Sequence, residues 1–498
     1  MNSSGYSSDW LGDALGISPR FNRVYTSLTS DSRKSAAGSL FVALPGEKFD
    51  GHDFILAAVA SGAEAVLADF DRIPAGLPAN VEIFAVKNTL DAYRKLAASW
   101  RSTFSIPVIA VAGSVGKTTT KELLSAILRG RFRSVASTVG SQNGYVGIPM
   151  TLLSIPPTTE AAVIEVGIDE PGAMAEHLKI VVPTHSLLTA IGPEHLEKLI
   201  DLETVAREEG LALSIPAESN ATLIVRLDDP WIRKIADDLP SHANVWTCIL
   251  KDPVPADVDS AEKSLGKSLL DKFVRGDYLP GKEAIKVTLP DGSGFELSLP
   301  LPGIHNAGNL LTAVTAALSL SLSPIEIQRG LSTFQGVFGR SELKMLPGPT
   351  PVLCDYYNAN PTSVAAALDV LKNLSVKYHS RKRIAALGDM LELGPEEETF
   401  HRELAAKILA AKIDVLLLFG KRMVWLADEL KKIPGLPKVA HFSDQAALGA
   451  ALAREIRAGD AVLIKGSRSM KMETAWEAAF KMVEPTLLAE ATVTGTIP

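Results

Sequence analysis

The segment of this chain best suited to chemistry is VIAVAGSVGKTTT, at residues 108–120. A β-branched apolar run leads into a glycine turn, and the turn opens directly into a helical pattern. Glycines let backbone N–H groups approach phosphate oxygens, and a helix N-terminus adds a positive field. Lys117 can reach the β- and γ-phosphates of a nucleotide, and the Thr118 hydroxyl can hold Mg²⁺. The segment predicts a phosphate site, although Val111 replaces the first glycine of the strict eight-residue pattern. The alternative is that Lys117 and Thr118 are ordinary solvated residues at a helix start.

Two further polar residues stand at or beyond the ends of apolar runs. Glu165 lies near the end of the run 161–166, and His195 lies beyond the run 185–189. In open α/β sheets ligands bind beyond the carboxyl ends of the strands, so Glu165 could hold Mg²⁺ or a water molecule. It could instead be a surface charge. His195 could ligate a metal or orient a phosphate, but a lone histidine is more often a hydrogen-bonded loop residue.

Asn306 and Asn309 flank the start of a helical pattern in GIHNAGN, at residues 303–309. One interpretation is that at least one of them caps the helix. The other is that a carboxamide, which is both donor and acceptor, binds the edge of an adenine ring.

Two motifs follow strand patterns in the last third of the chain. DYYNANP (355–361) offers an acid, phenols and amides, although a turn before a proline-started helix also explains its end. KGSRS (465–469) places two cations and two hydroxyls on a glycine turn. That composition suits a carboxylate or phosphate, and equally a solvated basic loop.

Alternating strands and helices must position these residues. Parallel sheets flanked by helices are the architecture that such alternation predicts, so we expect an α/β protein. We expect three domains, at 1–104, 105–338 and 339–498. The polar stretch 251–272 is predicted to be an insertion or long loop, and the tail beyond Pro485 is predicted to fray. The expected strands lie at 40–44, 65–68, 108–112, 161–166, 185–189, 221–225, 352–355, 384–387, 415–419 and 461–464, with a hairpin at 286–299 and helices at 54–61, 307–320, 362–372 and 395–411.

Composition limits the classes of function. The chain has 498 residues, 46% hydrophobic and 21% charged, which suits a globular protein of several domains. A net charge of −7 disfavours nucleic acid as a partner. Cys248 and Cys354 have no metal-ligand spacing and fit a reducing compartment. The N-terminal residues resemble no signal peptide and no apolar run could cross a bilayer, so we expect a cytoplasmic protein without membrane insertion.

Taken together, these segments resemble the Mur ligase family over about residues 28–473, and most closely its D-alanyl-D-alanine-adding branch. The phosphate loop, NGYVGIPMTLL (143–153), EVG (165–167) and HLE (195–197) are similar to the family's central domain. SDSR (30–33), GSLFVALPG (38–46) and FDGH (49–52) are similar to its UDP-binding domain. The most specific motifs are DYYNANPTS (355–363), LGDMLELG (387–394) and KGSRS. The Asp-Asn-Pro-Arg motif of the diaminopimelate-adding branch has no counterpart.

The resemblance implies a small N-terminal α/β UDP-binding domain, a central P-loop ATPase-like parallel sheet and a C-terminal Rossmann-like doubly wound domain. The terminal carboxylate of a UDP-N-acetylmuramoyl-tripeptide would attack the γ-phosphate of ATP. The amine of D-alanyl-D-alanine would then displace phosphate from the acyl phosphate. Because two anions meet in the first step, cations such as Mg²⁺ are essential. A monomer is expected.

The resemblance also implies roles for individual residues. The catalytic residues would be Lys117, Glu165, His195 and Glu209, and the metal ligands Thr118, Glu165 and His195. The ATP site would comprise Gly113, Ser114, Val115, Gly116, Lys117, Thr118, Thr119, Asn306, Asn309, Arg340 and Asp355. The UDP-linked substrate would contact Ser30, Asp31, Ser32, Arg33, Asp50, Gly51 and His52. The dipeptide would contact Tyr357, Asn358, Asn360, Lys465, Ser467 and Arg468.

Glu209 is a departure from the family pattern. Family members usually carry a carbamylated lysine here, which supports a second metal ion beside the histidine of the HLE motif. Carbamate and carboxylate are both planar monoanions, but glutamate is roughly 3–4 Å shorter. A bridging water or a closer helix could span the difference. Loss of the second metal site is the alternative.

Two other functions stay open. One is an amide ligase of the same superfamily with a different amino-acid substrate. The other is a nucleotide-binding homologue with impaired catalysis, a reading that Glu209 alone favours.

Overall fold

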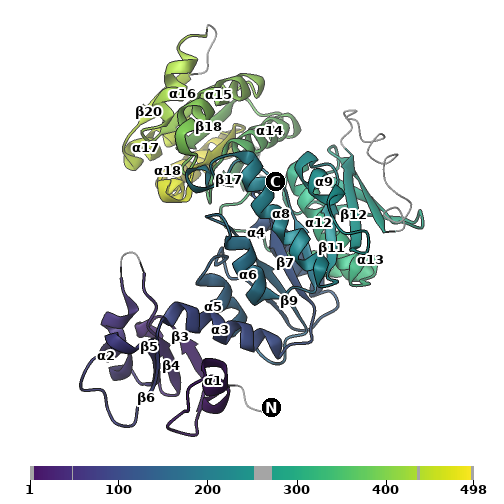
Figure 1. The fold of residues 1–498 in the computed structure, drawn as a ribbon. Coiled ribbons are helices and arrows are strands. Elements are labelled where there is room, and N and C mark those ends of the chain that lie inside the picture. The colour runs from purple at the N-terminus through teal and green to yellow at the C-terminus, as the bar shows by residue number, and fades with distance from the viewer. Residues whose placement is uncertain (1–4, 47–48, 252–271, 434–437, 495–498) are drawn as a thin grey trace.

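The computed structural model describes residues 5–46, 49–251, 272–433 and 438–494. Three sheets made largely of parallel strands follow one another along the chain, with helices packed against them (Figure 1). In Figure 1 the N-terminal sheet lies at the bottom and the C-terminal sheet at the top, on either side of the central one. The predicted α/β architecture is confirmed.

The N-terminal sheet has the strand order β3-β4-β5-β6, and all its neighbours are parallel. Its elements are β3 (Ser27–Thr29), η1 (Ser32–Lys34), β4 (Ser39–Val42), η2 (Gly51–Phe54), α2 (Ile55–Ala60), β5 (Ala63–Asp69), η3 (Phe70–Arg72) and β6 (Glu82–Val86), preceded by β1 (Tyr6–Ser7), α1 (Ser8–Leu15) and β2 (Val24–Tyr25). Helix α3 (Thr89–Ser102) leads from this sheet to the central one. Its buried Arg101 donates to the carbonyls of Val181 and Val182, which ties α3 to the central sheet's helices.

The central sheet has nine strands in the order β15-β14-β13-β12-β11-β10-β7-β9-β8. They are β7 (Val108–Ala112), β8 (Val135–Ser137), β9 (Ala161–Glu165), β10 (His185–Leu188), β11 (Thr222–Arg226), β12 (Asn244–Lys251), β13 (Phe273–Leu279), β14 (Ala284–Thr288) and β15 (Gly294–Ser298). The strands from β8 to β13 pair in parallel, and β14 and β15 form the predicted antiparallel hairpin. Every residue of β7 and β9 is buried, as expected for parallel strands covered on both faces.

Eight helices of the described chain accompany this sheet. They are α4 (Lys117–Leu128), α5 (Gly147–Leu153), α6 (Ala173–Val181), α7 (Leu196–Leu199), α8 (Leu202–Glu218), α9 (Pro230–Asp237), α12 (Ile304–Ser319) and α13 (Pro324–Leu331). Helix α12 is apolar on nearly all sides and packs against α4 and strand β12. Its N-terminus therefore lies beside the phosphate loop, which ends at the start of α4.

The C-terminal sheet has the order β16-β17-β21-β18-β19-β20, with only β16 antiparallel to its neighbour. Its strands are β16 (Glu342–Leu346), β17 (Thr350–Asp355), β18 (Arg383–Gly388), β19 (Val415–Phe419), β20 (Lys438–Phe442) and β21 (Ala461–Lys465). Its helices are α14 (Pro361–Lys377), η4 (Gly394–Glu396), α15 (Glu397–Ala410), α16 (Met423–Leu430), α17 (Gln445–Glu455), η5 (Arg468–Met470) and α18 (Met472–Thr494). Because β17 and β21 are parallel neighbours with Asp355 opposite Lys465, the two sequence motifs that follow these strands leave the same edge.

The prediction of a frayed tail was wrong up to Thr494, and residues 495–498 lie outside the described residues. Helix α18 continues through Pro485 to Thr494, and Leu487 is buried against the C-terminal sheet. Residues 252–271, where an insertion was predicted, lie outside the described residues. Both cysteines are buried and unpaired. Within the described residues, no helix combines the length and apolar character needed to span a bilayer.

Candidate active site

The phosphate loop between β7 and α4 depends on two glycines with left-handed backbone angles. Gly113 has φ 116° and Gly116 has φ 94°. A Cβ on Gly113 would lie 2.5 Å from Thr189 Oγ1, and one on Gly116 would lie 2.5 Å from Asn309 Oδ1. No side chain caps α4, so its first N–H groups have no intrahelical partner and are available to a phosphate. This cradle fits the predicted nucleotide phosphates.

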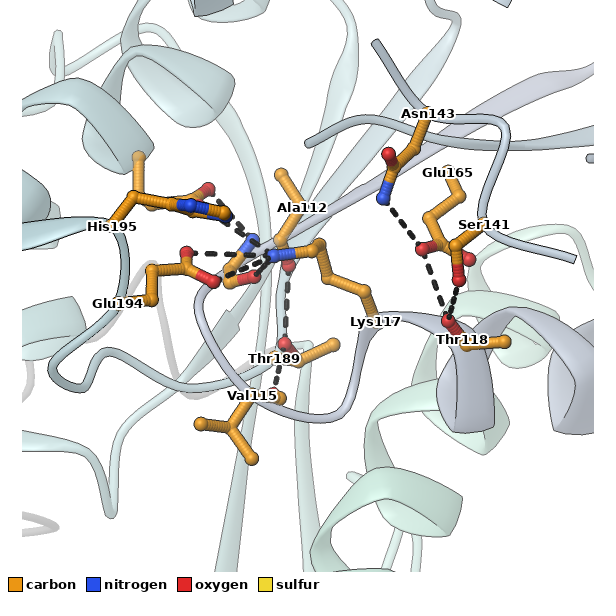
Figure 2. Close-up of polar contacts among 12 residues, drawn as sticks. Ala112, Val115, Lys117, Thr118, Ser141, Asn143, Glu165, Thr189, Glu194 and His195 are labelled. Carbon is orange, nitrogen blue, oxygen red and sulfur yellow. Dashed lines mark hydrogen bonds and ion pairs between the residues drawn. The ribbon is translucent and has the colours of Figure 1, made fainter. Parts of the chain in front are cut away.

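Lys117 lies in a cage of oxygen atoms at the start of α4. Its Nζ donates to the Gly113 carbonyl and lies 3.2 Å from Glu194 Oε2 and 3.8 Å from Glu209 Oε1 (Figure 2). Burial disfavours the charged lysine, but Glu194, Glu209 and Glu165 together raise the Lys117 pKa above its ordinary value. Burial also raises the pKa of Glu194 well above its usual range, against the opposing attraction of Lys117. An arriving polyphosphate would compete with these carboxylates for the ammonium.

Glu209 is fully buried on α8 and supports the loop directly. Its Oε2 accepts the Gly113 N–H at 2.7 Å, whereas its Oε1 is buried without a hydrogen-bond partner. The sequence-based expectation placed Glu209 beside a metal ion near His195. The structure places its carboxylate against the glycine turn and Lys117, so its demonstrated contact is with the loop.

Thr118 and Glu165 form a second polar group on the other side of the loop, as Figure 2 shows. The Thr118 hydroxyl donates to Glu165 Oε1 at 3.0 Å, and Asn143 Nδ2 donates to the same oxygen at 2.8 Å. Ser141 Oγ lies 3.3 Å from Thr118 Oγ1, and Glu165 Oε2 is buried without a hydrogen-bond partner.

These oxygens fit Mg²⁺, which prefers hard oxygen ligands and is usually held by one or two carboxylates together with phosphates and water. The described residues contain no group of three or more His, Cys, Asp or Glu that could hold a metal unaided. Such a site would therefore need the nucleotide to complete it.

His195 stands apart from Thr118 and Glu165, although all three line the same cavity of about 280 Å³, here called the phosphate-loop cavity. His195 has a left-handed backbone (φ 49°), and its Nδ1 lies 2.8 Å from Glu392 Oε2. The adjacent Leu196 N–H donates to the Glu392 carbonyl at 3.0 Å. The predicted metal ligands are thus divided between a Thr118–Glu165 pair and a histidine that contacts the C-terminal sheet's loops.

Asn306, Asn309, Arg340 and Asp355 line an adjoining cavity of about 200 Å³, the Asn309 cavity. The capping interpretation was wrong for both asparagines, because the N-cap residue of α12 is Gly303 and no side chain caps the helix. Instead, Asn306 Nδ2 donates to the Pro302 carbonyl, and Asn309 Nδ2 donates to Asn306 Oδ1. The cavity continues to Ser114 and Gly116 of the phosphate loop, the arrangement needed for a base joined to its phosphates.

A third cavity of about 490 Å³, the Arg468 cavity, gathers four of the six predicted dipeptide contacts. They are Tyr357, Asn358, Ser467 and Arg468. Lys465 and Asn360 instead line the Asn309 cavity. Lys465 is buried and paired with Asp355 at 2.6 Å, and Asn360 caps α14 through the Ser363 N–H, as the alternative interpretation of this motif expected.

The residues predicted to contact the UDP-linked substrate all lie in the N-terminal sheet's loops. Asp31 and Arg33 form an ion pair in the turn after β3. Asp50 pairs with Arg72 at 2.6 Å, and its Oδ1 lies 2.7 Å from Nδ1 of the buried His52. Nε2 of His52 accepts the Asp69 N–H, so both its ring nitrogens hold the sheet's loops together. Ser30, Ser32 and Gly51 belong to the same two turns.

The residues of these cavities that sequence reasoning missed as site residues include Ser141, Asn143, Glu194, Glu392 and Lys471. Each stands in or beside a motif that the sequence already singled out. Their roles depend on which loops meet in space, which single-sequence periodicity does not contain.

The fold and these cavities define a nucleotide-dependent enzyme with a phosphate loop on a parallel sheet and a second α/β unit whose loops line the same cavities. Three family models match consecutive stretches of the chain: "Mur ligase family, catalytic domain" at 24–101, "Mur ligase middle domain" at 111–317 and "Mur ligase, glutamate ligase domain" at 339–468.

Curated relatives match the chain over nearly its whole length. The UDP-N-acetylmuramoyl-tripeptide–D-alanyl-D-alanine ligase of Bacillus subtilis is 32% identical over 90% of this chain and 91% of its own. The ligase of that name from Synechocystis is 34% identical over 91% of this chain and 90% of its own. The chain belongs to the Mur ligase family and is an enzyme of the ligase class.

Solved structures agree with this assignment. MurF from Acinetobacter baumannii is similar with a TM-score of 0.80 and 26% identity, covering 96% of this chain and 100% of that one. MurF from Thermotoga maritima, solved in complex with ADP, has a TM-score of 0.75 and 26% identity, covering 92% and 98%.

Proposed function

We propose that this chain joins D-alanyl-D-alanine to a UDP-N-acetylmuramoyl-tripeptide, with ATP and Mg²⁺, in cytoplasmic synthesis of peptidoglycan precursors. The observation that carries the proposal is the continuity of the three cavities. Arg340 lines the phosphate-loop and Asn309 cavities, Tyr357 lines the phosphate-loop and Arg468 cavities, and Asn358 lines all three. A nucleotide, an acyl group and an amine could therefore meet at one point.

In the first step a carboxylate oxygen of the tripeptide attacks the γ-phosphorus, and the bond to the bridging oxygen of ADP breaks. Two anions approach each other, so fixed positive charge lowers the barrier. Lys117 would leave its cage of carboxylates for the γ-phosphoryl group. Arg340, whose Nε is buried without a hydrogen-bond partner, would add a second cation from the C-terminal side.

Thr118 and Glu165 would hold Mg²⁺, which neutralises charge on the β- and γ-phosphates when it is bound. Glu165 Oε2, which makes no hydrogen bond and lies 3.6 Å from Nζ of the buried Lys121, supports this role.

In the second step the dipeptide's neutral amine attacks the acyl carbon. The C–O bond to the phosphoryl group breaks, inorganic phosphate leaves with the electron pair, and the amine's extra proton passes to solvent. Residues 339–498 would supply the dipeptide, 105–338 the ATP and 1–104 the UDP moiety.

The test is phosphate release from ATP with each substrate omitted in turn. The proposal expects turnover only when ATP, UDP-N-acetylmuramoyl-tripeptide and D-alanyl-D-alanine are all present. Turnover with a single amino acid in place of the dipeptide would favour the other amide ligases of the family. Nucleotide binding without turnover under any combination would favour the impaired homologue.

A further inference from the structure

The Arg468 cavity has opposite charges among the residues that line it. Arg468 and Lys471 are its cations, and Glu392 is its carboxylate, beside His195. The Arg468 guanidinium lies 5.7 Å from the centre of the Tyr357 ring, and its Nη1 donates to Glu473. Glu392 is 60% exposed at its side chain, so its charge is accessible from the cavity even though one oxygen contacts His195.

The carboxylate lies on the side where the phosphate-loop cavity adjoins. His195 lines both cavities, and Glu392 reaches it at 2.8 Å. Arg468 and Lys471 line only the Arg468 cavity among the three described here. The cavity therefore has an anionic side at Glu392, beside the His195 that it shares with the phosphate-loop cavity, and a cationic side at Arg468 and Lys471, of which Arg468 packs on the shared Tyr357.

Three residues of this cavity also share an uncommon backbone conformation. His195 has φ 49°, Glu392 has φ 64° and Lys471 has φ 47°. Non-glycine residues rarely adopt these angles, and such residues concentrate at ligand sites where the surrounding structure enforces them. His195 is the N-cap residue of α7 and Lys471 the C-cap residue of η5, so these two angles belong to helix ends, and Glu392 adopts its angle in the loop after β18.

The geometry points to Glu392 as the residue that binds the ammonium group of the incoming dipeptide, with Arg468 and Lys471 binding its carboxylate. This inference rests on the proposed function. A dipeptide is a zwitterion about 7 Å long, and only one orientation satisfies both sides of the cavity. That orientation directs the nitrogen toward the phosphate-loop cavity, where the acyl phosphate forms. Glu392 thus selects a free N-terminus and orients its nitrogen, and the bound ammonium releases one proton to solvent before the resulting neutral amine attacks the acyl carbon.

The experiment crosses two protein variants with two ligands. Glu392→Gln removes the charge and keeps the shape, and Glu396→Gln makes the same change at an exposed residue that lines none of the three cavities. D-alanyl-D-alanine is measured through its KM. N-propionyl-D-alanine, which lacks only the ammonium, is measured through its inhibition constant against the dipeptide.

Glu392→Gln is expected to raise the KM for D-alanyl-D-alanine about tenfold to a hundredfold, because a charge-assisted contact is lost. Its inhibition constant for N-propionyl-D-alanine and its KM for ATP should stay within about twofold of the wild type. Glu396→Gln should change none of these values. Lys471→Met should weaken both ligands alike, because both carry the carboxylate.

Equal weakening of both ligands by Glu392→Gln would overturn the inference, because it would mean that Glu392 only positions His195 or the loops. An unchanged KM for the dipeptide would also overturn it. Failure of the wild type to use D-alanyl-D-alanine at all would instead contradict the proposed function.

Discussion

Lys117 contacts protein oxygen atoms in this structure and would contact phosphate oxygen atoms when a nucleotide binds. The exchange between these two sets of partners defines its proposed role. Without nucleotide, the ammonium contacts the Gly113 carbonyl, Glu194 and Glu209. A triphosphate carries more negative charge than two carboxylates of which one, Glu194, has a strongly raised pKa. The cage therefore keeps the buried lysine charged until its ligand arrives.

Lys117→Met should lower turnover about 10²-fold or more, because it removes charge that meets the developing charge on the phosphoryl group. Phosphate release under saturating substrates measures the effect, and Lys179→Met, at an exposed lysine of α6, is the control. If Lys117→Met turned over at close to the wild-type rate, the phosphate loop would have no part in the mechanism.

Glu209 should make the enzyme indifferent to dissolved CO₂. A glutamate side chain supplies a carboxylate without reacting with CO₂, whereas a lysine must first be carbamylated. Turnover in bicarbonate-free buffer should equal turnover with added bicarbonate, whereas Glu209→Lys should be inactive or bicarbonate-dependent.

A bicarbonate requirement in the wild type would mean that a lysine elsewhere forms the carbamate. Lys198, the nearest in sequence to the HLE motif, is poorly suited. It lies 3.6 Å from Asp169 and 3.5 Å from Glu170, which raise its pKa and so reduce the neutral amine that reacts with CO₂.

At the residue scale, the sequence predicted the parts of the site that have local signatures. The glycine turn with Lys117 and Thr118 follows β7, and Glu165 ends the neighbouring strand β9, so these residues could be inferred from strand ends alone. Glu392 could not be, because its contact with His195 joins residues almost 200 positions apart. Lys465 was predicted to contact the dipeptide because it belongs to the KGSRS motif. In the structure it is buried beside Asp355 and lines the Asn309 cavity.

Helices α4 and α12 form the element pair on which nucleotide binding depends. Gly116→Ala should weaken ADP binding at least about tenfold, since a Cβ would lie 2.5 Å from Asn309 Oδ1 and φ 94° strains any side chain. Isothermal calorimetry measures the affinity. Gly76→Ala is the matched control, because Gly76 has φ 83° but nothing within 4 Å of an added Cβ. Equal affinity for ADP in the wild type and in Gly116→Ala would mean that the phosphate loop does not bind the nucleotide.

His177 on α6 should make the packing of α6 against α5 and α3 sensitive to acid. It is fully buried, both ring nitrogens lack partners, and burial lowers its pKa from 6.5 to about 4. The unfolded chain therefore binds the proton first, and stability falls as pH drops from about 6.5 toward 4.

At pH 5 the difference between the pKa of His177 in the unfolded and folded chain lowers the free energy of unfolding by about 2 kcal/mol. His177→Phe keeps a ring against Tyr145 and cannot titrate, so between pH 7.5 and 5 it should lose about 2 kcal/mol less stability than the wild type. Urea denaturation at both pH values measures this, with His242→Gln as an exposed control. Parallel losses in wild type and His177→Phe would show that His177 does not contribute.

At the element scale, buried strands and long helices were predictable, whereas edges were not. Strands β8, β16 and β20 lie at or near sheet edges, are only partly buried and lack a strong apolar run. The tail was predicted to fray because its end is small and polar. Instead α18 continues through Pro485, and Val483 and Leu487 pack against the C-terminal sheet and offset the hydrogen bond that the proline loses.

The whole molecule should close when nucleotide binds. His195–Glu392, Leu196–Glu392 and the 3.3 Å contact of Arg340 with Ser141 join the phosphate-loop side to the C-terminal sheet. These polar contacts lie around cavities that a nucleotide would fill, so binding should favour the closed arrangement.

Small-angle scattering with a non-hydrolysable ATP analogue should record a smaller radius of gyration than for the free protein. Gly116→Ala, at the same analogue concentration, should not change. A radius of gyration unaltered by the analogue in the wild type would mean that the domains do not move.

The two cysteines give this motion a direct probe. Cys248 and Cys354 are fully buried, and burial raises the pKa of each thiol to about 12, so neither forms thiolate readily near neutral pH. Toward maleimide dyes the native protein should behave as if it had no cysteine. Cysteines introduced at exposed Ser102 and Lys432, in α3 and beyond α16, would then carry a fluorescent donor and acceptor, and neither native cysteine would have to be removed. Single-molecule energy transfer could follow opening and closing in real time, because the native thiols would not react with the dyes.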